Sequence, residues 1–173
     1  MRPTLVFSGY SPRVAQDWFP VFESMSLRPV MAGSPSGPAT AATNRPRWAK
    51  LSPNVTDLAE IAGAAIDAGA DAVTLINTVM GLAIDPVTRK ARLGNFGGGL
   101  SGAAIHPVAV RAVNDVHQAR PDATIIGVGG VTSGEDVVEL LLAGASAVQV
   151  GTATFRDPKA PGRILRELQH WCR

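Results

Sequence analysis

The sequence contains little of what several protein classes require. Of its 173 residues only Cys172 is a cysteine, so no intrachain disulfide can form and the chain fits a reducing compartment. The net charge is only +2, and no run of Lys and Arg forms the basic stripe that nucleic-acid binding needs. No apolar run reaches the ~18 residues of a membrane span, and Leu5-Val6-Phe7 is too short for the core of a secretory signal. We therefore expect a cytoplasmic protein that has neither nucleic acid nor a membrane as a partner.

What the sequence does contain is a repeated unit of helix, glycine turn and buried strand. Residues 143–152 repeat the pattern of residues 68–78, and in each copy a helical periodicity stops at a glycine, Gly144 or Gly69. The apolar run that follows does not alternate with polar residues, which is typical of a strand covered on both faces in a parallel sheet. With 46% hydrophobic residues and 18 glycines, the composition indicates a single α/β domain. Polar residues end both strands, where such architectures bind ligands.

Residues 1–44 differ from the rest of the chain. They hold six prolines and show no sustained period of two or 3.6 residues. We interpret them as an atypical, weakly ordered N-terminal extension, with a short helix around residues 14–24 and a loop at 31–43. The α/β domain is then expected over residues 45–173.

Over that domain, periodicity and capping signals place strands and helices in strict alternation. The strands are expected at residues 48–52, 72–76, 124–128 and 147–150. The helices are expected to begin at the N-cap Thr56, at Pro107, at the capping box that starts with Ser133 and at Asp157-Pro158. The connection over 79–105 is long enough to be functional. Four right-handed βα units make either half of an eight-stranded barrel or a small open sheet, and the strands alone do not decide between them.

Two glycine-containing strand ends predict a phosphate site. Gly129-Gly130 and Gly151-Thr152 end consecutive strands, and each leaves backbone N–H groups free of a bulky side chain. In (β/α) barrels the loops after the last two strands commonly hold a phosphate, and a nearby helix N-terminus favours one too. The alternative is that these glycines only make tight turns.

Further positions offer polar groups at the same end of the sheet. Lys50 lies between apolar neighbours in a strand, and a buried ammonium there needs either an anionic ligand or a structural ion pair. Asn77 and Thr78 follow the next strand. Asn can donate and accept hydrogen bonds at once, which suits a planar imide or carboxylate, although it is also a common turn residue. Ser101-Gly102 closes a glycine run and reads equally well as a hinge or as an anion-binding nest.

No metal site is predicted from the sequence. His106 and His117 have no carboxylate or cysteine at metal-ligand spacing, so we expect both at the surface. His170 and Cys172 are two residues apart on the last expected helix, so they do not face each other as a Cys–His pair would.

Together these residues resemble the C-terminal half of a dihydroorotate dehydrogenase of the class 1B type, from about Pro46 onward. The resembling stretches are residues 50–57, 76–78, 98–102, 126–131 and 143–152. One glycine-rich stretch would be a weak sign, whereas five in family order and at family-like spacing are highly specific. The resemblance implies an α/β fold of the (β/α)8 TIM-barrel family, of which this chain holds about the last four βα units.

The resemblance also implies an activity and a cofactor. Enzymes of this family bind FMN and oxidise dihydroorotate to orotate in the de novo synthesis of the pyrimidine nucleotide UMP. By resemblance, the cofactor-binding residues are Lys50, Ile76, Gly102, Gly129, Gly130, Gly151 and Thr152, and the substrate-binding residues are Asn77 and Thr78. In such enzymes the lysine stabilises the reduced flavin anion, the glycines hold the phosphate, and a cysteine on a loop of the N-terminal half removes the proton.

Compared with the family pattern, the chain is expected to be a truncated, catalytically incomplete form. It has about half the length of a full barrel, and Cys172 lies in the wrong context for the base, so no catalytic residue is predicted. The family's usual partner is an iron–sulfur flavoprotein subunit that passes electrons to NAD. Two open sheet edges also favour a homo-oligomer. The alternatives are a non-catalytic half-barrel that binds FMN or another phosphorylated ligand, and a related pyrimidine-reducing FMN barrel.

Overall fold

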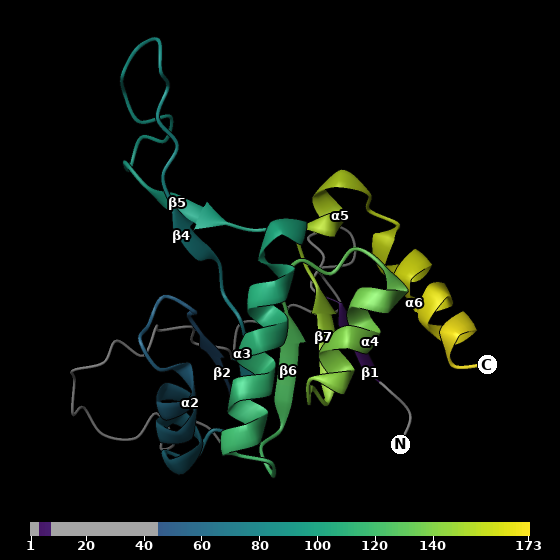
Figure 1. Cartoon of the computed structure of the whole chain (residues 1–173). Helices are drawn as coiled ribbons and strands as arrows, with labels where there is room; N and C mark the ends of the chain where they lie inside the picture. The colour runs from purple at the N-terminus through teal and green to yellow at the C-terminus, as the bar shows by residue number, and fades with distance from the viewer. Residues whose placement is uncertain (1–3, 8–44) are drawn as a thin grey trace.

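A computed structural model describes residues 4–7 and 45–173 of the chain. Its main feature is a five-stranded parallel sheet in the order β1-β7-β6-β3-β2 (Figure 1). The strands are β1 Thr4–Phe7, β2 Trp48–Leu51, β3 Ala72–Leu75, β6 Ile125–Val128 and β7 Ala147–Val150. The four strands expected from the sequence are therefore confirmed to within a residue at most ends.

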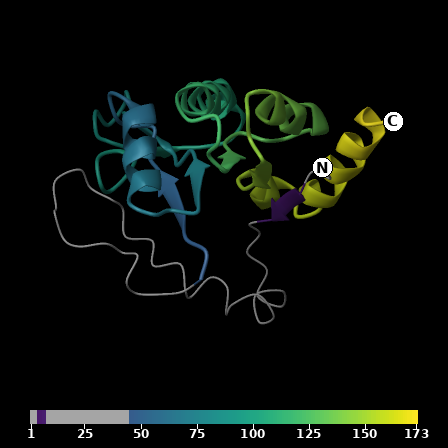
Figure 2. The same cartoon turned by 90° about the horizontal axis from the view of Figure 1, so that it is seen from below.

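The winding of the sheet is that of a barrel wall. Strands β2, β3, β6 and β7 are neighbours in the order in which they follow along the chain, whereas a doubly wound sheet would reverse its order part-way. Figure 2 shows the connecting helices in an arc along one side of the sheet. These helices are α2 Leu58–Asp67, α3 His106–Ala119, α4 Gly134–Leu142 and α6 Ala160–Trp171. The structure thus decides for a partial (β/α)8 barrel over a small open sheet.

Strand β1 was not expected from the sequence. It pairs in parallel with β7, with Thr4 opposite Ala147 and Phe7 opposite Val150, so it extends the sheet beyond the four predicted strands. The helix around 14–24 and the loop at 31–43 lie outside the described residues. The division into an extension over 1–44 and a domain over 45–173 therefore stays a prediction.

Local capping explains where most helices begin and end. The capping box of α4 is confirmed, because the Ser133 side chain accepts from the Asp136 N–H and Asp136 reaches back to the Ser133 N–H. Gly69 and Gly144 end their helices at φ of +90° and +117°, a conformation that favours glycine. The N-cap of α2 is Asp57 rather than the predicted Thr56, since the Asp57 carboxylate accepts from Glu60 N–H at 3.0 Å.

The core lies between the sheet and the helices. The residues of α3 that were predicted to face inward are all buried, and they are Ala109, Ala112, Val113 and Val116. On α6, Ile164 and Leu168 are buried and Leu165 is half-buried, so the predicted apolar stripe is confirmed in its main part. The sheet contributes the side chains that alternate toward the helices, including Val73, Leu75, Ile125, Val148 and Val150.

The connection between β3 and α3 is more ordered than its sequence suggested. It contains β4 Val79–Gly81 and β5 Gly98–Leu100, which pair as antiparallel strands and project beyond the sheet in Figure 1. A bridge between Ile84 and Ala91 closes the hairpin further out, and the short 3-10 helix η2 Ala103–Ile105 leads into α3.

The segment between β7 and α6 also differs from expectation. A short helix α5 Ala153–Arg156 precedes Asp157, and α6 begins at Ala160 rather than at Asp157-Pro158. Across the described part of the chain, no helix combines the length and apolar character that spanning a membrane requires.

Candidate functional site

The predicted site residues occupy the carboxyl ends of the parallel strands. Lys50 lies near the end of β2, Asn77 and Thr78 follow β3, Gly129-Gly130 follows β6, and Gly151-Thr152 follows β7. Because the four strands are parallel and adjacent, these ends form one rim (Figure 1). Lys50, Asn77, Gly130 and Gly151 are therefore on the same side of the molecule, as the sequence required.

The glycine loops of this rim pack directly against one another. A Cβ on Gly130 would lie 2.8 Å from the carbonyl oxygen of Gly102, and one on Gly102 would lie 3.8 Å from Thr152 Cγ2. A Cβ on Gly129 would lie 3.5 Å from Ile76 Cγ1. Five of the seven predicted cofactor-binding residues thus meet in one patch. Gly129 and Gly130 have no room for a side chain, since a Cβ on Gly129 would also lie 2.7 Å from Ala109 Cβ.

Several backbone N–H groups in this patch have no acceptor within the described part of the chain. Among the described residues, the N–H groups of Gly130 and Val131 pair with no oxygen, and the same holds for those of Gly151 and Thr152. Gly129 and Gly130 adopt φ of +147° and +69°, so the chain turns sharply at that point. Gly151 has open space in front of it, since a Cβ there would meet no atom within 4 Å. Neighbouring N–H groups without an acceptor are the kind of group that anion-binding nests present.

Lys50 is exposed, so the expectation of a buried lysine is wrong. Its register partner Thr74 is buried, but β2 is the edge strand of the described sheet and gives Lys50 a neighbour on one side only. Desolvation by the surrounding protein nevertheless lowers the pKa of the Lys50 amine from its ordinary value. The side chain keeps contact with solvent while part of its hydration is displaced, and no carboxylate among the described residues pairs with it.

Asn77 presents hydrogen-bonding groups to the open rim. It is exposed, and its Oδ1 accepts from the Thr78 N–H at 2.9 Å, while its Nδ2 has no partner among the residues described. The Asn77 N–H donates to the Leu51 carbonyl at 2.9 Å, which fixes the backbone relative to β2. Thr78 is half-buried, and its side chain packs against Gly99 of the hairpin so closely that only glycine fits.

Asn54 is a site residue that sequence reasoning did not single out. Its Nδ2 donates to the Thr78 carbonyl at 2.9 Å, and its Oδ1 accepts from the Met80 N–H at 2.8 Å. Asn54 therefore connects the loop after β2 to the start of β4 and holds the Thr78 backbone. The signal was present, because Asn54 follows a strand as Asn77 does.

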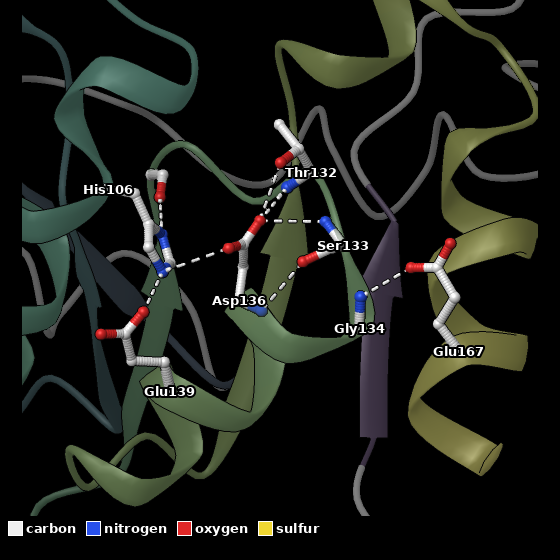
Figure 3. Close-up of polar contacts among 8 residues, drawn as sticks. His106, Thr132, Ser133, Gly134, Asp136, Glu139 and Glu167 are labelled. Carbon is white, nitrogen blue, oxygen red and sulfur yellow. Dashed lines mark hydrogen bonds and ion pairs between the residues drawn. The ribbon is translucent and has the colours of Figure 1, made fainter. Parts of the chain in front are cut away.

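His106 is buried, and the expectation of a surface residue is wrong. Its Nδ1 is 2.8 Å from the Gly129 carbonyl oxygen, and its Nε2 is 3.1 Å from a Glu139 carboxylate oxygen and 3.9 Å from one of Asp136 (Figure 3). These three side chains bring one imidazole nitrogen and two carboxylate oxygens within 4.8 Å, a grouping not visible in sequence spacing. Nothing local could have revealed it, because the acceptors lie 23 and 33 residues further along the chain.

The other predicted non-site residues fall away from the rim. His117 is half-buried rather than at the surface, and its ring packs where Gly144 leaves room for it. Cys172 is exposed at the C-cap of α6, and His170 lies on the same helix.

A family model described as dihydroorotate dehydrogenase matches residues 10–172. The chain belongs to the dihydroorotate dehydrogenase family. The matched range begins before Pro46, where the resemblance found in the sequence starts, and it includes the whole of that resemblance.

Individual members of the dihydroorotate dehydrogenase family are similar over most of this chain. The dihydroorotate dehydrogenase B (NAD(+)) catalytic subunit of Pelobacter propionicus is 51% identical over 143 residues, which are 83% of this chain and 47% of that protein. The protein of the same name from Solidesulfovibrio magneticus is 56% identical over 127 residues, which are 73% of this chain and 41% of that protein. The chain therefore spans less than half the length of these curated relatives.

A solved structure supports the same fold. The crystal structure of DHODH from Eimeria tenella in complex with ferulenol matches with a TM-score of 0.61 and 29% identity. The match covers 73% of this chain and 34% of that one. The likeness places the parallel sheet and its helices in the TIM-barrel fold of that enzyme.

Proposed function

We propose that this chain carries the phosphate side of an FMN site and part of the substrate site of a dihydroorotate dehydrogenase. The reaction is the oxidation of dihydroorotate to orotate in UMP synthesis, the activity of the family to which the chain belongs. The observation that carries the proposal is that Gly102, Gly130 and Thr152 meet at the carboxyl ends of β6 and β7, where N–H groups have no acceptor among the described residues.

The residues of the rim fit FMN in two respects. The loops after the last two strands offer N–H donors that have no acceptor among the described residues, which suits a phosphate dianion, and Gly151 faces open space because a Cβ there would meet no atom within 4 Å. Gly102, Gly129, Gly130, Gly151 and Thr152 would hold the phosphate. When bound, FMN would supply the hydride acceptor that no amino-acid side chain provides.

The remaining rim residues would bind and orient the organic groups. Lys50, with its partly desolvated ammonium, would place positive charge beside the flavin ring, and Ile76 would border the ring with apolar surface. Asn77 has an unpaired amide donor group, which suits the carbonyl and carboxylate oxygens of orotate, and Thr78 would add its hydroxyl.

Proton removal is assigned to no residue of the described rim. Cys172 is the only cysteine of the chain and is the exposed C-cap of α6. We therefore expect the chain by itself to bind FMN without oxidising dihydroorotate at an ordinary rate.

The proposal extends to partners. The relatives from Pelobacter and Solidesulfovibrio are named as catalytic subunits, so an iron–sulfur flavoprotein subunit is the electron acceptor we propose. Self-association through the sheet edges is a further part of the proposal, because β2 is an edge of the described sheet. A cytoplasmic location stays a prediction from the sequence.

Flavin titration tests the proposal. The full chain is titrated into FMN and, separately, into riboflavin, which lacks the phosphate, while flavin fluorescence is followed. Two amide bonds to a charged phosphate at about 1.5 kcal/mol each predict that FMN binds about 100-fold more tightly than riboflavin. Absence of flavin binding, or equal affinity for the two flavins, would contradict the proposal.

A second candidate is a site for a different phosphorylated ligand, since amides recognise the phosphate and not the ring. Competition by inorganic phosphate distinguishes the two. If phosphate displaces FMN and riboflavin never binds, the rim recognises phosphate alone and the flavin assignment fails. To distinguish a related pyrimidine-reducing FMN barrel, the reduction of uracil and the oxidation of dihydroorotate are both assayed. A polypeptide that supplies the first four strands of the barrel is present in both assays.

A further inference from the structure

The loop that joins β6 to α4 is held at both ends by hydrogen bonds to side chains of helices α3 and α4. At its start, His106 Nδ1 donates to the Gly129 carbonyl oxygen at 2.8 Å. At its end, one Asp136 oxygen accepts from the Thr132 N–H at 2.7 Å, the Thr132 hydroxyl at 2.8 Å and the Ser133 N–H at 2.9 Å (Figure 3). Between these two anchors lie Gly130 and Val131, whose N–H groups have no acceptor in the described part of the chain.

The hydrogen bond from His106 to the Gly129 carbonyl also sets the direction of the Gly130 N–H. A trans peptide is planar, so its carbonyl oxygen and its N–H point in opposite directions. The peptide between Gly129 and Gly130 is not among the cis bonds of the chain. With the carbonyl turned toward His106, the Gly130 N–H points away from it. Two consecutive glycines rotate freely, so without this bond the peptide plane has little to fix it.

The imidazole ring is itself fixed. The carbonyl can only accept, so Nδ1 carries a proton, and Nε2 faces the carboxylates of Glu139 and Asp136. The side chain keeps only 10% of its accessible surface. His106 lies at the start of α3, directly after η2, so the ring links two helices to the glycine loop. Gly130 packs against its backbone, because a Cβ there would be 2.8 Å from His106 N.

We propose that His106 is a positioning residue that orients the Gly129–Gly130 peptide, so that the Gly130 and Val131 amides are presented to the phosphate of the flavin. The inference rests on the proposed function for the identity of the ligand. The claim that His106 orients the Gly129–Gly130 peptide concerns the ligand-free loop and rests on the contacts of His106 alone.

Variants that keep only one of the two hydrogen bonds of the His106 ring distinguish a positioning role from a role in packing. In His106→Asn the side-chain amide replaces the Nδ1 donor, in His106→Gln it reaches toward Glu139 instead, and in His106→Leu both contacts are lost. His170→Leu is the matched control, because His170 is exposed on α6. Each full-length variant is titrated with FMN and with riboflavin, and its folding is checked by circular dichroism.

We expect His106→Leu and His106→Gln to bind FMN about tenfold more weakly, the equivalent of one misplaced hydrogen bond, while riboflavin affinity stays within twofold. His106→Asn should recover FMN affinity to within about threefold of the parent chain, and His170→Leu should change neither flavin. Parental FMN affinity in His106→Leu overturns the proposal. Equal losses for both flavins, or failure of His106→Asn to recover affinity, also overturn it, because each indicates a role in packing only. Should His106→Leu not fold, the comparison of His106→Asn with His106→Gln decides.

If the parent chain binds no flavin, the proposed function fails, and the claim that His106 orients the Gly129–Gly130 peptide is judged separately. Amide NMR of the ligand-free chains is then the readout. We expect the Gly130 and Val131 amide signals to move in His106→Gln and to stay near their parental positions in His106→Asn. Unmoved signals in both variants would overturn the positioning role without reference to any ligand.

Discussion

Gly130→Ala tests whether the glycine pair is shaped by close packing as well as by its ligand. Gly130 has φ of +69°, a conformation that costs an L-residue about 1–2 kcal/mol. A Cβ would also lie 2.8 Å from both the Gly102 carbonyl oxygen and His106 N, and such overpacking adds about 1–3 kcal/mol. We expect the free energy of unfolding to fall by about 2–5 kcal/mol, and FMN affinity to fall more than about tenfold because the amide shifts.

Gly151→Ala supplies the contrasting case. A Cβ on Gly151 meets no atom within 4 Å, and its φ is outside the left-handed region, so stability should change by less than about 0.5 kcal/mol. The added methyl nevertheless occupies the space in front of the rim, and FMN affinity should fall about tenfold with riboflavin unaffected. Gly94→Ala is the matched control, since its Cβ also meets open space but lies in the hairpin beyond the rim.

Two assays read these variants. Urea unfolding followed by circular dichroism gives the free energy of unfolding, and flavin fluorescence titration gives the affinity. A Gly130→Ala chain as stable as the parent would refute the packing argument. A Gly151→Ala chain with parental FMN affinity would refute the placement of the phosphate, whatever Gly130→Ala does.

Three further changes have defined outcomes. Burial alone would raise the pKa of the Asp136 carboxyl, but hydrogen bonds from Thr132 and Ser133 more than offset it and leave the pKa below its ordinary value. Asp136→Asn should therefore lower the free energy of unfolding by about 1 kcal/mol at pH 7. The difference should shrink as the pH falls below about 4, because the parent chain then loses the same stability, and urea unfolding at each pH measures it. Leu140→Ala, at a fully buried position, should cost about 3 kcal/mol, and a loss under 1 kcal/mol in the same assay would contradict the described core. Lys50→Met should raise the free energy of unfolding by about a few tenths of a kcal/mol after allowing for exposure, because it removes a partly desolvated ammonium, while FMN affinity falls. A lower free energy of unfolding in the same urea assay would contradict this.

Local signals in the sequence were sufficient to predict most of the fold. Gly69 and Gly144 mark the ends of helices because their left-handed conformation is a local property, and the capping box at Ser133 involves residues three apart. The order of the strands in the sheet could not be predicted this way. It depends on pairing between segments far apart in the chain, as with β1, which joins β7 across almost the whole sequence.

In the candidate site, too, the features that depend on local sequence signals were predicted and those that depend on distant contacts were not. The glycines at the strand ends were predicted because parallel strands deliver their carboxyl ends to one edge, and the structure brings Gly102, Gly130 and Thr152 together there. The environment of Lys50 was misjudged, because a strand of apolar neighbours indicates burial only when strands flank it on both sides. His106 was misjudged because its carbonyl and carboxylate acceptors come from the next strand end and helix, contacts that no local pattern encodes.

The most direct measurement of the central claim is a map of backbone amide shifts in the full chain as FMN is added. The account predicts that the largest shifts fall on Gly130, Val131, Gly151 and Thr152, whose N–H groups lack acceptors among the described residues. Lys50 and Asn77 should shift less, as they would contact the ring and the substrate. Shifts centred on the outer hairpin or on α6, with the rim amides unmoved, would contradict the account.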